Sequence, residues 1–405
     1  MNIFSEKRIV LGVTGSIAAY KSAILASYLT KSGAKVDTVL TEAATELISP
    51  MTFSALTGRM AYRDEDLWQQ DDHVLHIDLG EKNQAFLIAP ASANTIAKLA
   101  HGLADNLLTL AALASRTQIA VAPAMDGGMY SHPATQANLT ILRERGVRIW
   151  GPAAGHLASG LSGKGRMLEP EQLAGHLRQL LGKEGILKDK KVVVTAGGTQ
   201  EPIDPVRVIS NRSSGKQGYA IAQAAVDAGA EVTLISGPVN LMPPIGASFL
   251  PAQTAAEMAE VVLEETSSAD LLIMAAAVAD FRAVQPADQK IKKDHMDEHQ
   301  LELEKTEDIL LLVSDRKKEQ GVGPDYVVGF AAETNDLLEN ARTKLDHKNL
   351  DLIAANDISR RDVGIGADQN QVVLIWPDGR SKDLGLLPKS EIAAKLIEEI
   401  AELFA

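Results

Sequence analysis

Short apolar runs alternate with segments of helical periodicity along the first half of the chain. Residues 8–13 are apolar and predict a strand, a Gly15-Ser16 turn follows, and residues 17–30 repeat apolar positions with the period of a helix. Further strands are predicted at 35–40, 85–89, 118–121 and 147–150. Because strands that alternate with helices form parallel sheets covered on both faces, this half is predicted to be doubly wound.

The same alternation restarts after a polar, glycine-bearing stretch at 181–190. A helix is predicted from about Gly218, and residues 290–305 and 364–380 break the rhythm and are interpreted as loops or hairpins. The predicted strands of this half are 191–195, 231–235, 270–274, 326–330 and 351–354. The fold class is therefore α/β, with two doubly wound, mainly parallel-sheet domains expected at 1–185 and 190–405.

Composition supports this organisation and narrows the function. A chain of 405 residues exceeds the ~250–300 residues at which single cores stop growing, and no apolar run reaches the ~18 residues of a membrane span. The start of the chain lacks the pattern of a secretory signal, so a cytoplasmic protein is expected. The absence of cysteine excludes disulfides, thiolate metal sites and a cysteine nucleophile. A net charge of -13 argues against a nucleic-acid partner.

Glycine and hydroxyl residues follow two predicted strands of the first half. Gly12, Gly15 and Ser16 precede a helix, whose first N–H groups attract anions, so this turn is either a phosphate site or a tight turn that needs glycine. Ser92 and Asn94 follow the run at 85–89. They either approach a ligand at the carboxyl end of the strand or cap the next helix.

Two other features of the first half could carry chemistry. Residues 123–126 follow the predicted strand at 118–121, as Ser92 follows the strand at 85–89. His76 is either a base or proton shuttle, since histidine titrates near neutrality, or a structural histidine.

Cations gather early in the second half. Residues 207–216 combine arginine and lysine with hydroxyl residues and a glycine ahead of a helix, and 290–293 add three lysines. In an acidic protein these clusters predict an anion cradle, and the alternative is cations on solvated loops. Thr195 and Thr199 flank two glycines after a strand and are suited to a phosphate or ribose.

Taken together, these segments resemble the bifunctional phosphopantothenoylcysteine decarboxylase and phosphopantothenate–cysteine ligase family of coenzyme A biosynthesis. The resemblance covers nearly the whole chain in order. The matching segments are 15–21, 90–95, 123–125, 163–167, 195–199, 210–216, 275–280, 290–293 and 329–334. It implies a flavodoxin-like flavoprotein domain followed by a Rossmann-like ligase domain.

For the first domain, the resemblance implies FMN as cofactor and 4'-phosphopantothenoylcysteine as the compound that is oxidatively decarboxylated to 4'-phosphopantetheine. Oxidation of the thiol carbon creates an electron sink for loss of CO2, and the flavin supplies the redox chemistry. His76 matches the active-site histidine of the family. The residues implied to bind the cofactor are Gly15, Ser16, Thr41, Ser92 and Met125.

The chain departs from the family at two positions of this domain. Ser159 stands where the family has a proton-donating cysteine, and a hydroxyl is far less acidic than a thiol of pKa ~8.5. Asp126 stands where a substrate-binding asparagine is usual, and an ionised Asp126 would repel the carboxylate that must leave. Three interpretations remain: a variant that uses water or protonated Asp126 as donor, a half-reaction enzyme, or a domain that has lost turnover. The variant is favoured because the flavin loops and His76 are present.

For the second domain, the resemblance implies a ligase that joins 4'-phosphopantothenate and cysteine through an acyl-cytidylate formed from CTP, with Mg2+ screening the triphosphate. Asn211 would act on the acyl-cytidylate, and Arg207 and Lys216 would bind substrate. Asp280 would read the cytosine or bind its sugar. The residues implied to contact the nucleotide are Ala275, Ala276, Asp280, Lys290, Glu307, Asp308, Ile309, Leu310, Phe330, Lys344 and Lys348.

The resemblance also implies a homo-oligomer, in which trimers of flavin domains and dimers of ligase domains build a dodecamer. Competing hypotheses are a ligase with an impaired flavin domain, a flavin-binding regulatory protein and an NAD-dependent oxidoreductase. The complete ligase half argues against the regulatory protein, and the missing Gly-x-Gly-x-x-Gly fingerprint argues against the oxidoreductase.

Overall fold

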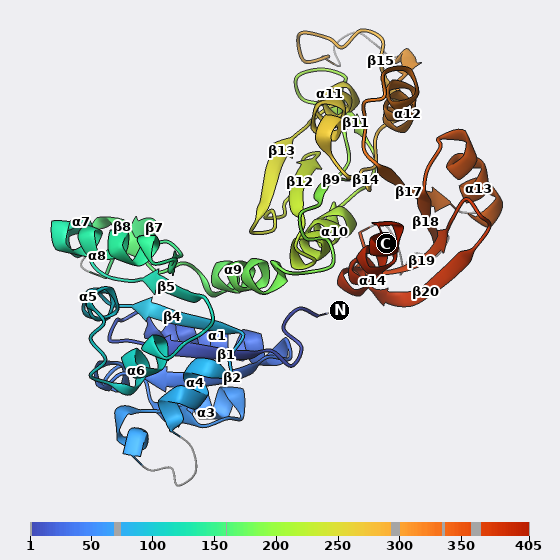
Figure 1. Cartoon of the computed structure of the whole chain (residues 1–405). Coiled ribbons are helices and arrows are strands. Elements are labelled where there is room, and N and C mark those ends of the chain that lie inside the picture. Colours follow the sequence, from blue (N-terminus) through green and yellow to red (C-terminus); the bar gives the residue numbers. More distant parts are fainter. Residues whose placement is uncertain are drawn as a thin grey trace. The chain divides into compact units, whose positions relative to one another are not determined.

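The computed structural model describes residues 2–68, 74–158, 160–292, 300–333, 337–357 and 366–404. Internal contacts divide the chain into an N-terminal unit, Asn2–Leu181, and a C-terminal unit, Gly182–Ala405 (Figure 1). Each unit has its own sheet and its own core, so each is described by itself.

The N-terminal unit is built on a parallel sheet of six strands in the order β3-β2-β1-β4-β5-β6. Its strands are β1 Arg8–Val13, β2 Lys35–Leu40, β3 Ala61–Tyr62, β4 Ala85–Ala91, β5 Ile119–Pro123 and β6 Arg148–Ile149. Its helices are α1 Ala19–Lys31, α2 Glu42–Thr45, α3 Pro50–Thr57, α4 Leu75–Glu81, α5 Ala93–His101, α6 Leu107–Leu113, α7 Gly127–Ser131, α8 Pro133–Glu144 and α9 Pro170–Gly182. A hairpin of β7 Ala153–His156 and β8 Ser162–Arg166 follows the sheet.

Helices cover both faces of this sheet, as the alternation of apolar runs predicts. Residues of α1, α3 and α9 pack with Ile9 and Leu11 of β1 in one core. Residues of α4, α5, α6 and α8 pack with Val10 of the same strand in a second core. Because successive strand residues point to opposite faces, a continuous apolar run is what a strand buried on both sides requires.

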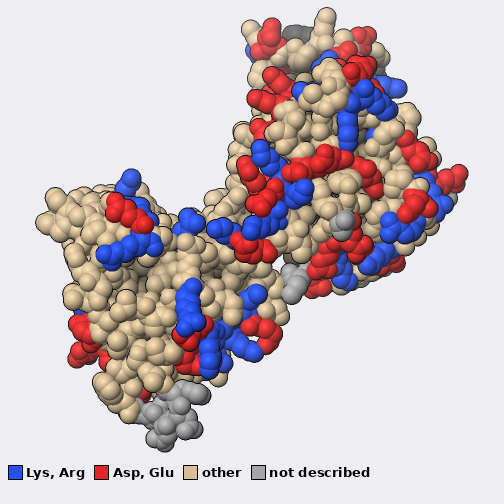
Figure 2. Space-filling model, in the orientation of Figure 1, with Lys and Arg blue, Asp and Glu red and all other residues tan. Residues whose placement is uncertain are grey.

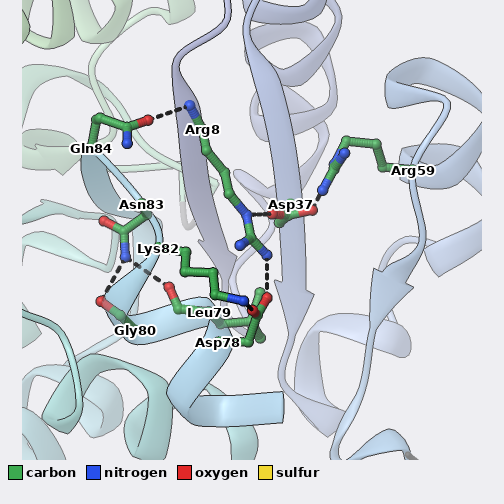
Figure 3. A network of polar contacts seen from close by, with 9 residues as sticks. All are labelled: Arg8, Asp37, Arg59, Asp78, Leu79, Gly80, Lys82, Asn83 and Gln84. Atoms are coloured by element: carbon green, nitrogen blue, oxygen red, sulfur yellow. Dashed lines mark hydrogen bonds and ion pairs between the residues drawn. The ribbon is translucent and has the colours of Figure 1, made fainter. Parts of the chain in front are cut away.

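A partly buried polar network ties two strands to α4 near the amino end of β1 (Figure 3). Arg8 Nε donates to Asp37 Oδ2 at 2.5 Å and Arg8 Nη2 donates to Asp78 Oδ2 at 2.7 Å. Arg59 holds the other oxygen of Asp37, which is 1% exposed, and Lys82 pairs with Asp78. Since Asp78 lies on α4, this network fixes the helix that carries His76.

The C-terminal unit is built on an eight-stranded sheet in the order β13-β12-β9-β14-β17-β18-β19-β20. Its strands are β9 Lys191–Ala196, β12 Glu231–Ser236, β13 Ala247–Pro251, β14 Leu271–Met274, β17 Tyr326–Glu333, β18 Leu352–Asp357, β19 Gln369–Ile375 and β20 Ser381–Pro388. Two small ribbons pair β10 Gln200–Pro202 with β11 Val208–Ser210, and β15 Phe281–Ala283 with β16 Leu303–Lys305. Its helices are α10 Lys216–Asp227, α11 Ala255–Glu265, α12 Ile309–Gln320, α13 Leu337–His347 and α14 Lys389–Ala401.

This sheet is parallel from β13 to β18, and β19 and β20 continue it as antiparallel strands. Helices α10 and α14 cover one face, and α11, α12 and α13 cover the other. The predicted α/β class with mainly parallel sheets is therefore confirmed. Within the segment interpreted as a loop or hairpin, residues 369–375 form β19 and pair with β20 in a hairpin that extends the sheet, so the hairpin interpretation is confirmed there.

Lysine and arginine are interspersed with aspartate and glutamate over the face drawn in Figure 2. Among the described residues, no helix has the length and apolarity that crossing a membrane requires.

Candidate functional site

The residues expected at the flavin site follow four strands that lie side by side in the sheet. Ser16 follows β1, Thr41 follows β2, Ser92 follows β4 and Met125 follows β5, and the sheet places these strands in the order β2-β1-β4-β5. The strands are parallel, so all four residues lie at the same carboxyl edge. This edge is where open α/β sheets bind ligands.

The loops at this edge are joined to one another by hydrogen bonds. Thr14 Oγ1 donates to Pro90 O at 2.8 Å and accepts from Ser92 N at 2.9 Å, which links the loop after β1 to the loop after β4. A Cβ at Gly15 would lie 2.6 Å from the Cβ of Ala43, so only glycine allows the loops after β1 and β2 to approach so closely. Ser92 also caps α5 through Thr95 N, as the cap interpretation predicts.

Four buried polar atoms of the N-terminal unit have no hydrogen-bond partner in the part of the chain that the structure describes. They are Thr30 Oγ1, Thr38 Oγ1, Thr41 Oγ1 and His76 Nδ1, and of these Thr41 directly follows the carboxyl end of β2. Buried polar atoms are almost always hydrogen-bonded, so an unsatisfied one indicates a group that the protein itself does not supply. His76 is the second residue of α4, two positions before Asp78, which pairs with Arg8 at the amino end of β1. Thr41 Oγ1 therefore fits a polar cofactor bound at the carboxyl edge.

The hairpin β7–β8 forms a flap beside the end of β5. Met125 N donates to Gly165 O at 3.0 Å, and a Cβ at Gly165 would lie 2.2 Å from Met125 O, so this contact requires glycine. Asp126 caps α7, with its Oδ1 accepting from Gly128 N at 2.9 Å. The flap and α7 form an open pocket of about 450 Å³ that Asp126, Leu157 and Lys164 help to line. Ser159, which was expected in the flap, lies outside the described residues.

A buried lysine links the flap to the helix that follows the first loop. Lys21 of α1 is 4% exposed, and its Nζ donates to Met167 O at 3.2 Å and to Glu169 Oε1 at 2.9 Å. Glu169 also accepts from Arg166, the last residue of β8, at 2.8 Å. The hydrogen bond from Lys21 outweighs burial and lowers the pKa of Glu169. The base of the flap is therefore held to α1 by charged hydrogen bonds.

The residues expected at the ligase site converge on one pocket of about 720 Å³ in the C-terminal unit. It lies at the carboxyl ends of β14 and β17 and at the first turns of α10 and α12. The expected residues that line it are Asn211, Lys216, Ala275, Ala276, Asp280, Glu307, Asp308, Ile309, Leu310, Phe330, Lys344 and Lys348.

Backbone contacts position Asn211 in this pocket. Its Nδ2 donates to Val278 O at 2.9 Å, so the side-chain amide is held against the loop after β14. Thr195 Oγ1 accepts from Ala276 N at 3.1 Å and Thr199 Oγ1 accepts from Ala279 N at 2.9 Å. Both threonines are 0% exposed. Their hydroxyls therefore hold this loop in place, and the interpretation that they face a phosphate or ribose is wrong.

A charged pair and two backbone contacts shape one wall of the pocket. Asp308 caps α12 by accepting from Leu310 N at 3.1 Å, and its other oxygen pairs with Lys348 Nζ at 2.8 Å. The turn before the helix is fixed by Thr306 N, which donates to Asp280 O at 3.0 Å. These contacts bring residues from three separate segments to one wall.

Two expected site residues are not among those that line the pocket. Arg207 pairs with Asp204 at 3.5 Å and donates to Ile291 O at 3.1 Å. Lys290 is exposed on the loop beside it. Asp204 accepts hydrogen bonds from the backbone N–H groups of Arg207 and Ile291, so the loops that carry Arg207 and Lys290 are held together. Neither cation is among the residues that line the pocket.

Residues 4–182 match the Flavoprotein family model, and residues 187–404 match the model described as DNA/pantothenate metabolism flavoprotein C-terminal domain. The coenzyme A biosynthesis bifunctional protein CoaBC of Bacillus subtilis (strain 168) is 43% identical over 404 residues, which cover 99% of this chain and 98% of that protein. The chain belongs to the CoaBC family. It is a bifunctional flavoprotein enzyme of coenzyme A biosynthesis that combines a flavin-dependent decarboxylase with a ligase.

Other CoaBC proteins show the same full-length similarity. That of Escherichia coli (strain K12) is 43% identical over 397 residues, which cover 97% of this chain and 96% of that protein. The solved C-terminal domain of a CoaBC protein is 38% identical and covers 54% of this chain and 98% of that chain, with a TM-score of 0.45.

Three polar residues of the ligase pocket were missed by the sequence reasoning. Asn356 of β18, Asn370 of β19 and Lys389 at the start of α14 line it together with the twelve expected residues given above. Asn356 ends an apolar run that predicts only a strand, and Lys389 begins an ordinary amphipathic helix. A signal was present in the position of each residue, because both stand at an element end where side chains reach the edge of a sheet.

Proposed function

We propose that the C-terminal unit joins 4'-phosphopantothenate to cysteine through an acyl-cytidylate formed from CTP. The supporting observation is that twelve residues expected for this reaction from distant parts of the chain line one pocket. Asn211 would hold the acyl group near the α-phosphate, and Lys344 and Lys348 would contact the nucleotide. Cations and backbone N–H groups that meet developing negative charge are the main source of catalysis in such transfers.

Mg2+ is proposed to bind with the nucleotide. No group of three or more histidine, aspartate or glutamate side chains in the described ranges forms a metal site. Mg2+ often uses one or two carboxylates together with substrate phosphates, and the carboxylates of Asp280 and Glu307 line the pocket. The pocket therefore fits a metal that arrives with the triphosphate.

The ligase proposal is tested by incubating the protein with 4'-phosphopantothenate, CTP and Mg2+ in the absence of cysteine. Release of pyrophosphate and a mass equal to the acyl-cytidylate are expected, and both should fall when ATP replaces CTP. Equal turnover with both nucleotides would refute the assignment of CTP.

For the N-terminal unit, we infer that the flavin is FMN and that the decarboxylated compound is 4'-phosphopantothenoylcysteine. Ser16 and Thr41 would hold its polar groups at the carboxyl edge of the sheet, and the flap would exclude water from the reacting carbon. His76 would hold or move a proton at its buried Nδ1. When bound, FMN supplies the two-electron redox chemistry that this decarboxylation needs.

A second candidate function for this unit is an impaired decarboxylase, since Asp126 lines the flap pocket as an acid where the family usually has an amide. The two are separated by supplying 4'-phosphopantothenoylcysteine to the protein while its flavin absorbance is recorded. Release of CO2 supports the active variant, and a bound flavin without CO2 release supports the impaired one.

A homo-oligomer is also proposed. Tyr20, Ile24 and Tyr28 repeat along one side of α1 and are exposed, and Met51 of the adjacent α3 is 75% exposed. An apolar stripe of this kind is typical of a surface that packs against a second copy. Sedimentation should give a mass of several chains, and Tyr20→Lys should reduce it, whereas a monomer at working concentration would contradict the proposal.

A further inference from the structure

One end of the ligase pocket is built from residues that none of the roles above uses. Asn356, Asn370 and Lys389 come from β18, β19 and the first turn of α14. Asn356 lies two residues beyond Ala354, which packs in the core beneath α10 and α14. Alternate residues of a strand share a face, so Asn356 lies on the side of the sheet where these two helices begin.

Hydrogen bonds make this end of the pocket a fixed wall. Gln217 accepts from Asn370 Nδ2 and donates to Lys389 O, each at 3.4 Å. Lys216 pairs with Asp368 at 2.6 Å, and Lys389 N donates to Asp368 O at 3.0 Å. The starts of α10, α14 and β19 are therefore held together.

The wall presents one buried acceptor and one buried cation. Asn356 Oδ1 is buried without a hydrogen-bond partner from the described part of the chain. Lys389 is 7% exposed. Burial lowers the pKa of Lys389, the nearby charge of Lys216 lowers it further, and Asp368 opposes both. A ligand that brings a donor would satisfy Asn356 Oδ1, and an anionic group on the same ligand would meet the positive charge of Lys389.

We propose that this wall binds the head group of the amino-acid substrate, with Lys389 contacting the carboxylate of cysteine and Asn356 Oδ1 accepting a hydrogen bond from its amine. The proposal rests on the ligase function proposed above. An amino acid carries a donor and an anion on one carbon, whereas a phosphate group offers only acceptor oxygens to Asn356. The chemistry of the wall therefore favours the amino acid over the phosphates of the nucleotide.

This arrangement suits the second half of the ligation. An amine that donates one N–H to Asn356 keeps its lone pair for the acyl carbon. The new C–N bond forms as the bond from the acyl carbon to the phosphate oxygen breaks, CMP leaves, and the amine releases a proton to solvent. Asn356 and Lys389 are thus expected to matter only after the acyl-cytidylate has formed.

The test uses full-length Asn356→Ala and Lys389→Met variants, with Lys395→Met, exposed on the same helix, as the matched control. The KM for cysteine should rise about 10- to 100-fold in both variants, as expected for a lost charge-assisted hydrogen bond, and should stay unchanged in the control. Pyrophosphate release from CTP and 4'-phosphopantothenate without cysteine should equal that of the wild type.

Cysteamine, which lacks the carboxylate, isolates the contact with Lys389. The wild type should prefer cysteine to cysteamine, and Lys389→Met should lose about 10-fold or more of that preference while cysteamine reacts equally in both. An increased KM for CTP or a loss of cysteine-independent pyrophosphate release would show that the wall holds phosphates and would overturn the proposal. An unchanged KM for cysteine would also overturn it. If the wild type releases no pyrophosphate, the ligase function itself fails.

Discussion

The two units share a doubly wound fold but assemble their sites differently. In the C-terminal unit, most of the expected ligase residues meet in one pocket formed by a single sheet and its helices. In the N-terminal unit, the expected flavin residues follow four adjacent strands, and a separate hairpin provides the flap. The ligase site is therefore shaped by loops around one cavity, whereas the flavin site depends on how the flap is held at a sheet edge.

This difference predicts that substitutions in the two units affect different reactions. A pocket residue should affect ligation alone. A residue at the base of the flap should affect decarboxylation alone. The following predictions are ordered by the size of the expected effect.

The largest effect is expected for Asn211→Asp. Its amide is held against Val278 O at 2.9 Å, and a carboxylate there would lose this donor and place a charge beside the acyl-cytidylate. Ligation should fall by about 10²- to 10³-fold, as for removal of a group that stabilises developing charge. Decarboxylation of supplied 4'-phosphopantothenoylcysteine should stay at the wild-type rate. An unchanged rate of ligation would show that Asn211 takes no part in the reaction.

The next largest effect is expected for Arg8→Met, measured as stability. Asp37 is 1% exposed and, among the described residues, would keep Arg59 alone as its charged partner (Figure 3). A partly unpaired buried carboxylate should cost about 3 kcal/mol of the unfolding free energy of this unit. Thermal unfolding of Lys35→Met, which breaks an exposed pair with Glu6, should show almost no change.

The same network predicts a pH dependence of stability. Burial alone would raise the pKa of Asp78, but hydrogen bonds from Lys82 and Arg8 outweigh it and lower that pKa. A carboxyl group with a lowered folded pKa stabilises the fold above its unfolded pKa of about 3.9, and this contribution is lost as the pH falls through the folded value. Unfolding temperatures measured between pH 6 and pH 2 should therefore fall less steeply in Arg8→Met than in the wild type.

A smaller effect, on decarboxylation only, is expected for Lys21→Met. Without the ammonium, Glu169 and Met167 O lose the contacts that hold the base of the flap to α1. Decarboxylation should fall about 10-fold through a misplaced flap, with ligation unchanged. Lys31→Met, exposed near the end of the same helix, is the matched control. An equal loss in the control, or a loss of ligation, would show that Lys21 does not act by positioning the flap.

The smallest effect is expected for Asp126→Asn. Asparagine also caps helices, so α7 should keep its cap while the charge at the flap pocket is removed. Decarboxylation should rise by about 3- to 10-fold, because a charge that repels the leaving carboxylate is lost. Ser159→Cys should leave decarboxylation equal or higher. A decrease in Asp126→Asn would show that the acid has a role of its own.

Much of the fold follows from the sequence, because buried parallel strands are continuous apolar runs. The strands predicted at 8–13 and 35–40 coincide with β1 and β2. For β19 the sequence predicts only a loop or hairpin, because its polar residues obscure the apolar pattern of a buried strand. Asp37 lies inside a predicted strand, and its buried charge depends on Arg59, which is distant in sequence.

Site residues could be predicted from the sequence only where they belong to a recognisable motif. Asn211 and Lys216 belong to a conspicuous cluster, and the structure places both in the pocket. Lys21 meets Glu169 across 148 positions of the chain, and no local pattern indicates such a contact. Asn356 stands near the end of β18, but the sequence does not show what it meets there, because only the sheet order brings it to the helix starts.

The most direct test of two activities in one chain is mass spectrometry of the products formed from 4'-phosphopantothenate, cysteine, CTP and Mg2+. The account predicts that 4'-phosphopantetheine accumulates, with 4'-phosphopantothenoylcysteine as a transient species. Accumulation of 4'-phosphopantothenoylcysteine without 4'-phosphopantetheine would contradict an active flavin unit, and the absence of both would contradict the account as a whole.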